Sequence, residues 1–239
     1  MSYFSYTRNS TISLMFIFPF FLMYEILAYF LFDPSDYVIR NSADIIFRDI
    51  FEIITNNTLI TYNGLLLILI FSFIFYNFKN KSPKFTLSYI FFMFIEGIFF
   101  GLLLVFILNG FSVFNYSQQN YFFIDYSFMF YSCLGAGIWE EILFRLLLFS
   151  FLYKIIRSFF KGQDVFVLFL SIILSSILFS LFHYIGNNAD IFTLNTFLIR
   201  TFGGIFLGLL YYYRGFGIVV ISHISYDFIL VSLPLIYTN

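Results

Sequence analysis

Apolar stretches of about 20 residues follow one another along this chain of 239 residues, with short polar segments between them. A transmembrane helix needs a stretch of this length to cross the hydrocarbon core of a bilayer. The pattern therefore predicts an all-α fold, a polytopic membrane helix bundle of about seven transmembrane helices, or eight, in a single domain over residues 1–239. The stretches lie near residues 13–32, 61–78, 85–108, 127–152, 165–185, 192–213 and 216–236.

Residues 36–58 follow a different pattern. Isoleucines and phenylalanines alternate there with five charged residues, Arg40, Asp44, Arg48, Asp49 and Glu52. This spacing is typical of an amphipathic helix, and its charges exclude a membrane span. We expect a helix at the membrane interface, or alternatively a loop helix packed on the bundle.

The composition agrees with a membrane protein. Hydrophobic residues make up 61% of the chain and charged residues only 10%, against about 25% charged in a typical soluble domain. The net charge of −1 provides no basic surface for nucleic acid, so the lipid bilayer is the expected partner. Cys133 is the only cysteine, which excludes an intramolecular disulfide and a cysteine-rich metal site.

Basic residues predict the orientation, because cytoplasmic loops of membrane proteins carry an excess of lysine and arginine. They cluster between the second and third spans and between the fourth and fifth, whereas residues 109–126 and 186–191 contain none. We expect a cytoplasmic N-terminus in a prokaryotic inner membrane. The clustered residues are Lys79, Lys81, Lys84, Lys154, Arg157 and Lys161.

Three charged residues interrupt the apolar run near 126–153: Glu140, Glu141 and Arg145. Each charge near the bilayer centre costs about 2.5–3.5 kcal/mol on insertion scales, so packing alone does not explain three of them. Glu141 and Arg145 are four residues apart and can pair on one helix face. Glu140 is rotated from Glu141 by about 100° in an α-helix and can face a different surface.

The only two histidines also lie in apolar stretches. Phe179 precedes His183 by four residues, and Asp227 follows His223 by four, so each pair shares a helix face. A carboxylate beside a histidine can orient the ring or join it in holding a water molecule. Three helices thus offer the groups needed to activate water and to stabilise an oxyanion.

These motifs, in this order, resemble those of the CAAX protease and bacteriocin-processing (CPBP, or Abi) family of intramembrane endopeptidases. They are Glu140-Glu141-x-x-x-Arg145, Phe179-x-x-x-His183 and His223-x-x-x-Asp227. The resemblance covers about residues 125–235 and departs at Asp227, where many members have asparagine. It implies hydrolysis of a peptide bond in a membrane-associated protein or peptide, with an oligomeric state that the sequence does not define.

The resemblance also implies roles for these residues. Glu140 would be the general base acting on water, supported by His183. His223 and Asp227 would bind the water or the oxyanion, while Glu141 and Arg145 would hold the site together and Phe179 would border the substrate cavity.

The sequence is compatible with a metal site. Glu140, His183 and His223 could ligate zinc, which binds histidine and carboxylate ligands. The His-Glu-x-x-His helix of many zinc proteases is absent. Both a zinc-dependent and a metal-free, glutamate-dependent mechanism therefore fit the sequence.

Two other classes of function fit the same residues. An ion-coupled transporter also places acidic residues and histidine at membrane depth, although the N-terminal half shows no counterpart of the motifs. A catalytically silent scaffold or immunity protein would keep the fold without turnover. Glu25 and Glu96 also lie in predicted spans, and we expect them to have structural partners, with Arg200 a candidate partner of one of them.

The predicted span ends place the site residues at unequal depths. Counted from the cytoplasmic ends, His223, Glu140 and His183 would lie roughly 10, 18 and 27 Å deep at 1.5 Å per residue. Catalysis needs these groups around one water molecule. We therefore expect the fifth span to begin nearer Phe169, and the site to lie in a water-filled cavity at mid-membrane.

The distribution of basic residues predicts a topology that reporter fusions can test. A reporter fused after Lys161 should read cytoplasmic, and one inserted in residues 109–126 should read external. The reverse pattern would contradict the predicted orientation.

Overall fold

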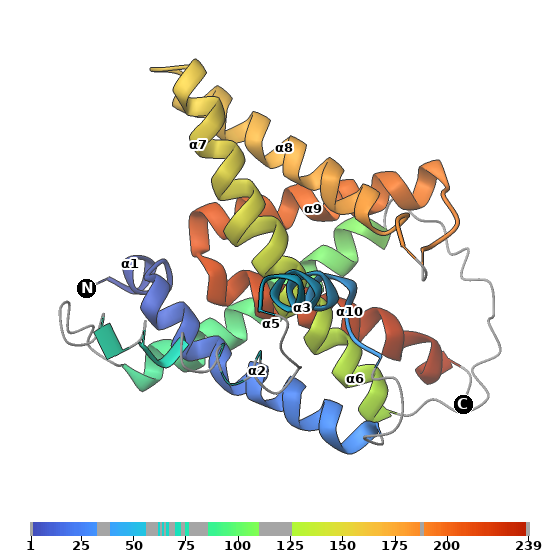
Figure 1. Ribbon diagram of the computed structural model, residues 1–239. Coiled ribbons are helices and arrows are strands. Elements are labelled where there is room, and N and C mark those ends of the chain that lie inside the picture. The colour runs from blue at the N-terminus through green and yellow to red at the C-terminus, as the bar shows by residue number, and fades with distance from the viewer. Residues whose placement is uncertain are drawn as a thin grey trace.

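The structure is a computed structural model that describes residues 2–32, 39–55, 86–109, 126–186 and 189–237, with scattered residues between 62 and 76. Within these ranges the regular elements are helices, and no strand occurs. Figure 1 shows them as a bundle in which long helices cross one another. The predicted all-α fold is confirmed.

Four of the described helices are long and apolar enough to cross a membrane. Their limits lie close to the predicted spans that begin at residues 13, 85, 165 and 192. They are α2 (Ser10–Leu31), α5 (Leu87–Asn109), α8 (Asp164–Phe182) and α9 (Leu194–Arg214).

Two more helical segments correspond to the predicted spans at 127–152 and 216–236. The last is α10 (Phe216–Tyr237), an apolar helix. The other is an unbroken helical run from residue 126 to residue 159, made of α6 (Tyr126–Gly135), η1 (Ala136–Glu140), η2 (Ile142–Phe149) and α7 (Ser150–Phe159). The predicted span 61–78, the segment 110–125 and the lysines at 79, 81 and 84 fall largely or wholly outside the described residues.

The amphipathic segment forms helix α3 (Ser42–Thr55), and residues 36–38 and 56–58 lie outside the described part. Helix α3 packs on the bundle through Phe47, whose ring centroid lies 5.6 Å from that of Trp139. Asp49 and Glu52 face outward. Figure 1 shows α3 end-on, in front of the central helices. Its position at the membrane interface stays a prediction.

Glycines allow α10 to approach its neighbours closely. A Cβ atom added at Gly101 of α5 would lie 2.8 Å from the carbonyl oxygen of Ser222, and one at Gly137 of η1 would lie 3.0 Å from the backbone nitrogen of Ile224. Small residues at helix contacts bring backbones together in membrane proteins, where packing drives association. Helix α10 is thereby held in the middle of the bundle.

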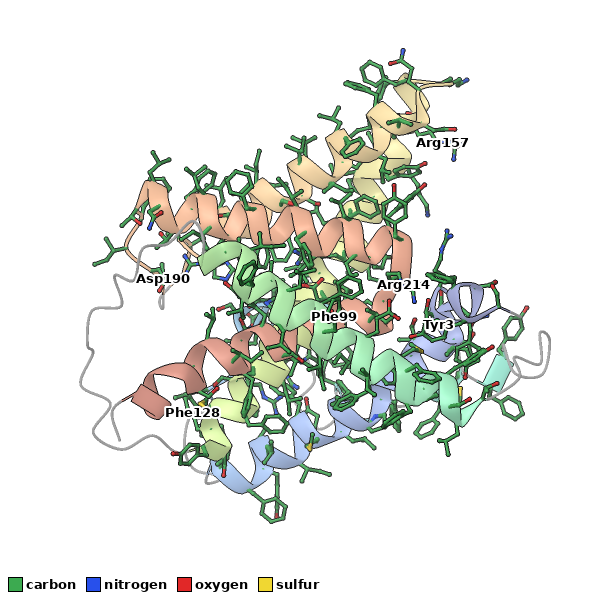
Figure 2. All side chains as sticks on the ribbon, turned by 180° about the vertical axis from the view of Figure 1, so that it is seen from behind. Tyr3, Phe99, Phe128, Arg157, Asp190 and Arg214 are labelled. Atoms are coloured by element: carbon green, nitrogen blue, oxygen red, sulfur yellow. The ribbon has the colours of Figure 1, made fainter. Side chains whose placement is uncertain are left out.

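An ion pair connects three elements near the N-terminus. Glu96 of α5 pairs with Arg214 at the end of α9, and its carboxylate accepts a 2.5 Å hydrogen bond from Tyr3 of α1 (Tyr3–Thr7). Figure 2 shows Tyr3 and Arg214 close together, far from Arg157 at the α7–α8 turn. Glu96 therefore has the structural partner that we expected, but that partner is Arg214.

Arg200 is not the partner of Glu25 or Glu96, so that expectation is wrong. Its Nη2 lies 2.5 Å from Asp190 in the connection before α9. Glu25 instead pairs with Arg40 and Arg48 of the amphipathic segment. The physical reason is proximity: Arg200 lies in the first half of α9, within reach of Asp190 in the preceding connection.

Neighbouring glycines of α9 provide a matched test of this packing. A Cβ atom at Gly204 would lie 2.9 Å from the Cβ of Ser176 on α8, whereas one at Gly203 would meet only Leu108, at an ordinary 3.4 Å. We expect Gly204→Ala to lower the free energy of unfolding by about 1–3 kcal/mol, which would appear as a lower unfolding temperature in detergent. Gly203→Ala should leave it unchanged or raise it slightly, since alanine favours helix. Equal effects would contradict the close α8–α9 contact.

Candidate active site

The helical run that carries the two glutamates is wider than an α-helix. Glu140 ends the π-helical segment η1, and Arg145 lies in the second π-helical segment, η2. Such segments are rare and often occur at functional sites. We predicted an angle of about 100° between Glu140 and Glu141 from α-helical geometry, and the π-helical segments on either side of Glu141 depart from that geometry. Residue composition gave no signal for this change of helix type.

Glu141 is fully buried and joins two helices. Its Oε1 accepts hydrogen bonds from Nη1 of Arg145 at 2.8 Å and from Nδ1 of His223 at 2.7 Å. A carboxylate accepts only, so Nδ1 of His223 carries a proton. The predicted Glu141–Arg145 pair is confirmed. Oε2 of Glu141 has no hydrogen-bond partner within the described part of the chain.

Arg145 extends this contact to two more helices. The side chain is 2% exposed, and its Nη2 lies 3.3 Å from the carbonyl oxygen of Gly204 on α9. The guanidinium carbon also lies 4.6 Å from the ring centroid of Phe179 on α8, a cation–π distance. One arginine thus contacts α8, α9 and its own helical run.

His183 lies at the C-terminal end of α8 and faces Glu140. Its Nδ1 lies 3.0 Å from the carbonyl oxygen of Phe179, which can only accept, so Nδ1 is the donor. The other nitrogen, Nε2, lies 4.0 Å from Oε2 of Glu140. The ring of Phe179 borders both histidines, with centroid distances of 5.0 Å to His183 and 6.1 Å to His223.

Asp227 completes the cluster one turn after His223 on α10. Its Oδ2 lies 3.5 Å from Nε2 of His223, so both nitrogens of that imidazole face carboxylate oxygens. The structure therefore brings the predicted site residues into one contact network. Its members are Glu140, Glu141, Arg145, Phe179, His183, His223 and Asp227.

The lengths of α7 and α8 explain how Glu140 and His183 meet. The helix that carries Glu140 continues to Phe159, beyond the predicted end at 152, and α8 begins at Asp164. The expected start near Phe169 is therefore wrong. Glu140 and His183 each lie about 19 residues, or roughly 28 Å, from the turn that joins the two helices. Figure 1 shows this turn projecting from the bundle.

Sequence reasoning missed one residue of the cluster, Asn41. Its Nδ2 donates a 2.9 Å hydrogen bond to Oε1 of Glu140, across 99 residues of sequence. Asn41 precedes α3, where asparagine commonly caps a helix, so the sequence signals a cap. No local pattern indicates the contact with Glu140.

Glu140, His183 and His223 do not form a ready-made zinc site in this arrangement. Within the described ranges, no group of three histidine, cysteine, aspartate or glutamate side chains is placed to hold a metal ion. Nδ1 of His223 binds Glu141 and Nε2 faces Asp227, so a metal at His223 would have to displace a carboxylate contact.

Comparison with protein families gives the class of protein. Residues 122–229 match the model of the Rce1-like family, described as type II CAAX prenyl endopeptidase Rce1-like. The match contains the whole predicted set from Glu140 to Asp227, and it supports membership of the CPBP family. With the apolar helices, this match supports a multi-pass membrane protein that carries a CAAX-protease-type region. No curated protein and no solved structure matches the chain.

Removal of Arg145 should test the buried contact. We expect Arg145→Ala to lower the folded yield and the unfolding temperature, because it leaves Glu141 buried with a lost partner, a penalty of about 3–5 kcal/mol. Arg157→Ala is the matched control, since Arg157 is 57% exposed and pairs with Asp164 at 3.3 Å. That surface pair should contribute about 0–1 kcal/mol. Similar yields from both variants would contradict a structural role for Arg145.

Proposed function

We propose that the protein is an intramembrane endopeptidase of the CAAX-protease type, in which Glu140 activates water to hydrolyse a peptide bond of a membrane-associated protein or peptide. The observation that carries this proposal is the 4.0 Å approach of Oε2 of Glu140 to Nε2 of His183. The family match supports the reaction class.

The hydrogen-bonding state of the two groups supports a shared water. Nδ1 of His183 donates to the carbonyl oxygen of Phe179, so the neutral form of the ring would present the lone pair of Nε2, like the carboxylate oxygen opposite. Two acceptors 4.0 Å apart can both accept from one water molecule, which would donate one hydrogen to each. The lone pairs of that water then point away from both groups, toward a substrate carbonyl carbon.

The proton of the attacking water passes to Glu140 in this scheme. The water oxygen bonds to the carbonyl carbon, and Glu140 later gives the proton to the leaving amine as the carbon–nitrogen bond breaks. His183 orients the water. Glu140 thus acts as base and then as acid, and no group remains changed at the end of the cycle.

His223 is the proposed donor to the oxyanion. Its Nδ1 is held by Glu141, and its Nε2 lies 3.5 Å from Asp227, so the oxyanion would have to take the place of that longer contact to accept from Nε2. A donor held in a buried site stabilises the negative charge that develops on the carbonyl oxygen. Glu141 and Arg145 hold this imidazole in place, and Phe179 provides an apolar wall for the substrate.

The proposed location is a prokaryotic cell membrane, with the N-terminus in the cytoplasm. A bilayer-embedded site selects substrates that are themselves membrane-associated, through a lipid group or an apolar segment. A prenylated peptide is the first probe because the matched family is described by its action on such substrates.

The alternative is a membrane scaffold that binds a peptide without cleaving it. Such a protein would need the apolar cavity wall but not the approach of Glu140 to His183. Turnover therefore separates the two functions.

Substitution of Glu140 tests the mechanism. We expect Glu140→Gln to reduce cleavage of an internally quenched farnesylated peptide by at least about 1,000-fold, because it removes the base while keeping the shape. Its unfolding temperature should remain near that of the wild type. In cells, a proteomic comparison of membranes with wild-type and Glu140→Gln protein should find a peptide terminus that the variant lacks.

Normal cleavage by Glu140→Gln would contradict the proposed mechanism. Peptide binding without cleavage by the wild-type protein would favour the scaffold. Loss of cleavage after treatment with 1,10-phenanthroline, restored by added zinc, would show that a metal takes part.

A further inference from the structure

We infer that Asn41 is a positioning residue for Glu140, supplied to the site by the N-terminal part of the chain. This inference rests on the proposed function of Glu140. Asn41 lies outside the family match, which begins at residue 122. The side chain fixes one carboxylate oxygen of Glu140 so that the other faces His183.

The orientation of the Asn41 amide follows from its contacts. Its Oδ1 accepts a 2.9 Å hydrogen bond from the backbone nitrogen of Ala43, which can only donate. The amide nitrogen must therefore be the group that lies 2.9 Å from Oε1 of Glu140. A reversed amide would lose both bonds and place oxygen against oxygen. Asn41 is thus held as a donor to the carboxylate.

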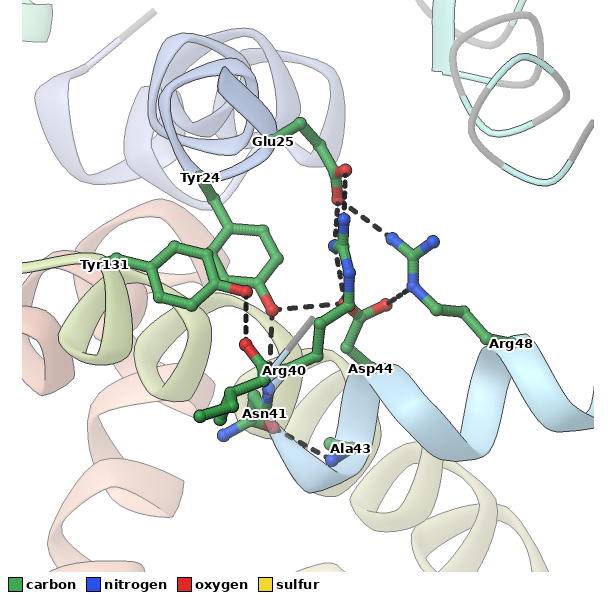
Figure 3. A network of polar contacts seen from close by, with 9 residues as sticks. Tyr24, Glu25, Arg40, Asn41, Ala43, Asp44, Arg48 and Tyr131 are labelled. Atoms are coloured by element: carbon green, nitrogen blue, oxygen red, sulfur yellow. Dashed lines mark hydrogen bonds and ion pairs between the residues drawn. The ribbon is translucent and has the colours of Figure 1, made fainter. Parts of the chain in front are cut away.

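Two tyrosines anchor the backbone that leads into Asn41 (Figure 3). The hydroxyl of Tyr131 donates to the carbonyl oxygen of Ile39 at 2.8 Å, and that of Tyr24 accepts from the backbone nitrogen of Asn41 at 3.4 Å. Their rings are stacked, with centroids 4.7 Å apart and planes within 2° of parallel. Tyr24 belongs to α2 and Tyr131 to α6, so residues 39–41 are fixed to two helices.

A partly buried ion network holds the same segment from the other side (Figure 3). Arg40 binds both carboxylate oxygens of Glu25, at 2.9 and 3.1 Å, and lies 3.0 Å from Asp44. Arg48 binds the same two acidic residues, at 3.0 and 2.7 Å. Burial lowers the pKa of Arg40, but the carboxylates of Glu25 and Asp44 outweigh it and raise the pKa overall. Arg40 therefore stays charged and the network persists.

The consequence for Glu140 is a defined rotation of its carboxylate. With Oε1 held by Asn41, Oε2 is the oxygen that remains for the water beside His183. A glutamate side chain that rotates freely would present either oxygen in many positions, and rates fall steeply when a reacting group leaves its productive geometry. Asn41 is thus expected to raise turnover without touching the substrate.

The Asn41→Asp substitution separates positioning from folding. Aspartate has nearly the same shape and can still accept from Ala43, since it is as good a helix cap as asparagine. Once ionised, it cannot donate to Glu140. In full-length protein with the farnesylated quenched peptide, we expect kcat to fall at least about tenfold, as for loss of a hydrogen bond to a charged group. KM should stay within about twofold, and the folded yield is checked separately because the new carboxylate faces that of Glu140.

Asn41→Ser provides a second variant in case Asn41→Asp fails to fold. Serine also caps a helix but is too short to reach Glu140, so the same fall in kcat is expected without an added charge. Asp49→Asn on the exposed face of α3 is the matched control and should retain wild-type kcat. Wild-type kcat in folded Asn41→Asp and Asn41→Ser would overturn the inference.

A measurement that does not depend on turnover distinguishes failure of the Asn41 inference from failure of the proposed function. Dicyclohexylcarbodiimide modifies protonated carboxyl groups in apolar surroundings, and mass spectrometry can follow its addition to Glu140. Loss of the Asn41 donor should speed this modification several-fold. Unchanged labelling of Glu140 in the Asn41 variants would overturn the inference, even if the peptide proved not to be a substrate. Faster labelling in these variants, together with no cleavage by the wild-type protein, would overturn only the proposed function.

Discussion

One buried carboxylate oxygen, Oε1 of Glu141, joins the parts of this molecule that form the site. It accepts from Arg145 on its own helical run and from His223 on α10, at 2.8 and 2.7 Å. A charge this deeply buried is tolerated only with partners. Removal of one partner leaves the carboxylate of Glu141 buried without full compensation for its lost hydration. The arginine in turn contacts the backbone of α9 and the ring of Phe179 on α8. The relative positions of four helical segments therefore depend on this oxygen.

The same constraint applies in the N-terminal part of the chain. Glu25 in α2 and Glu96 in α5 each lie in an apolar helix, and each is matched by arginine from a distant segment. The Glu25 network does more than neutralise charge, because Arg40 directly precedes the residue that contacts Glu140. A polar cluster that stabilises the fold in one place thus continues, through one amide, into the candidate active site.

The sequence predicted the helices well because membrane spans are read from long apolar stretches, and it predicted pairs four residues apart because helix geometry fixes them. It also indicated that Glu140, His183 and His223 should converge, since scarce polar groups in lipid turn toward one another. It failed where the answer depended on contacts between distant segments. The partner of Arg200, the amide of Asn41 and the π-helical turns around Glu140 have no local signature. The true end of α7 at Phe159 was missed because the basic residues after 152 suggested an earlier boundary.

The two helical segments that connect Glu140 and His183 to the α7–α8 turn are equal in length, and this equality restricts where residues can be inserted or deleted. One extra helical turn in α7 alone would carry the start of α8 outward and shift His183 by about 5.4 Å relative to Glu140. The same turn added to both arms would lengthen the projection and leave the two side chains facing one another. Insertions and deletions in this hairpin are therefore tolerable in compensating pairs, which change the length of the projection while the two side chains stay in register.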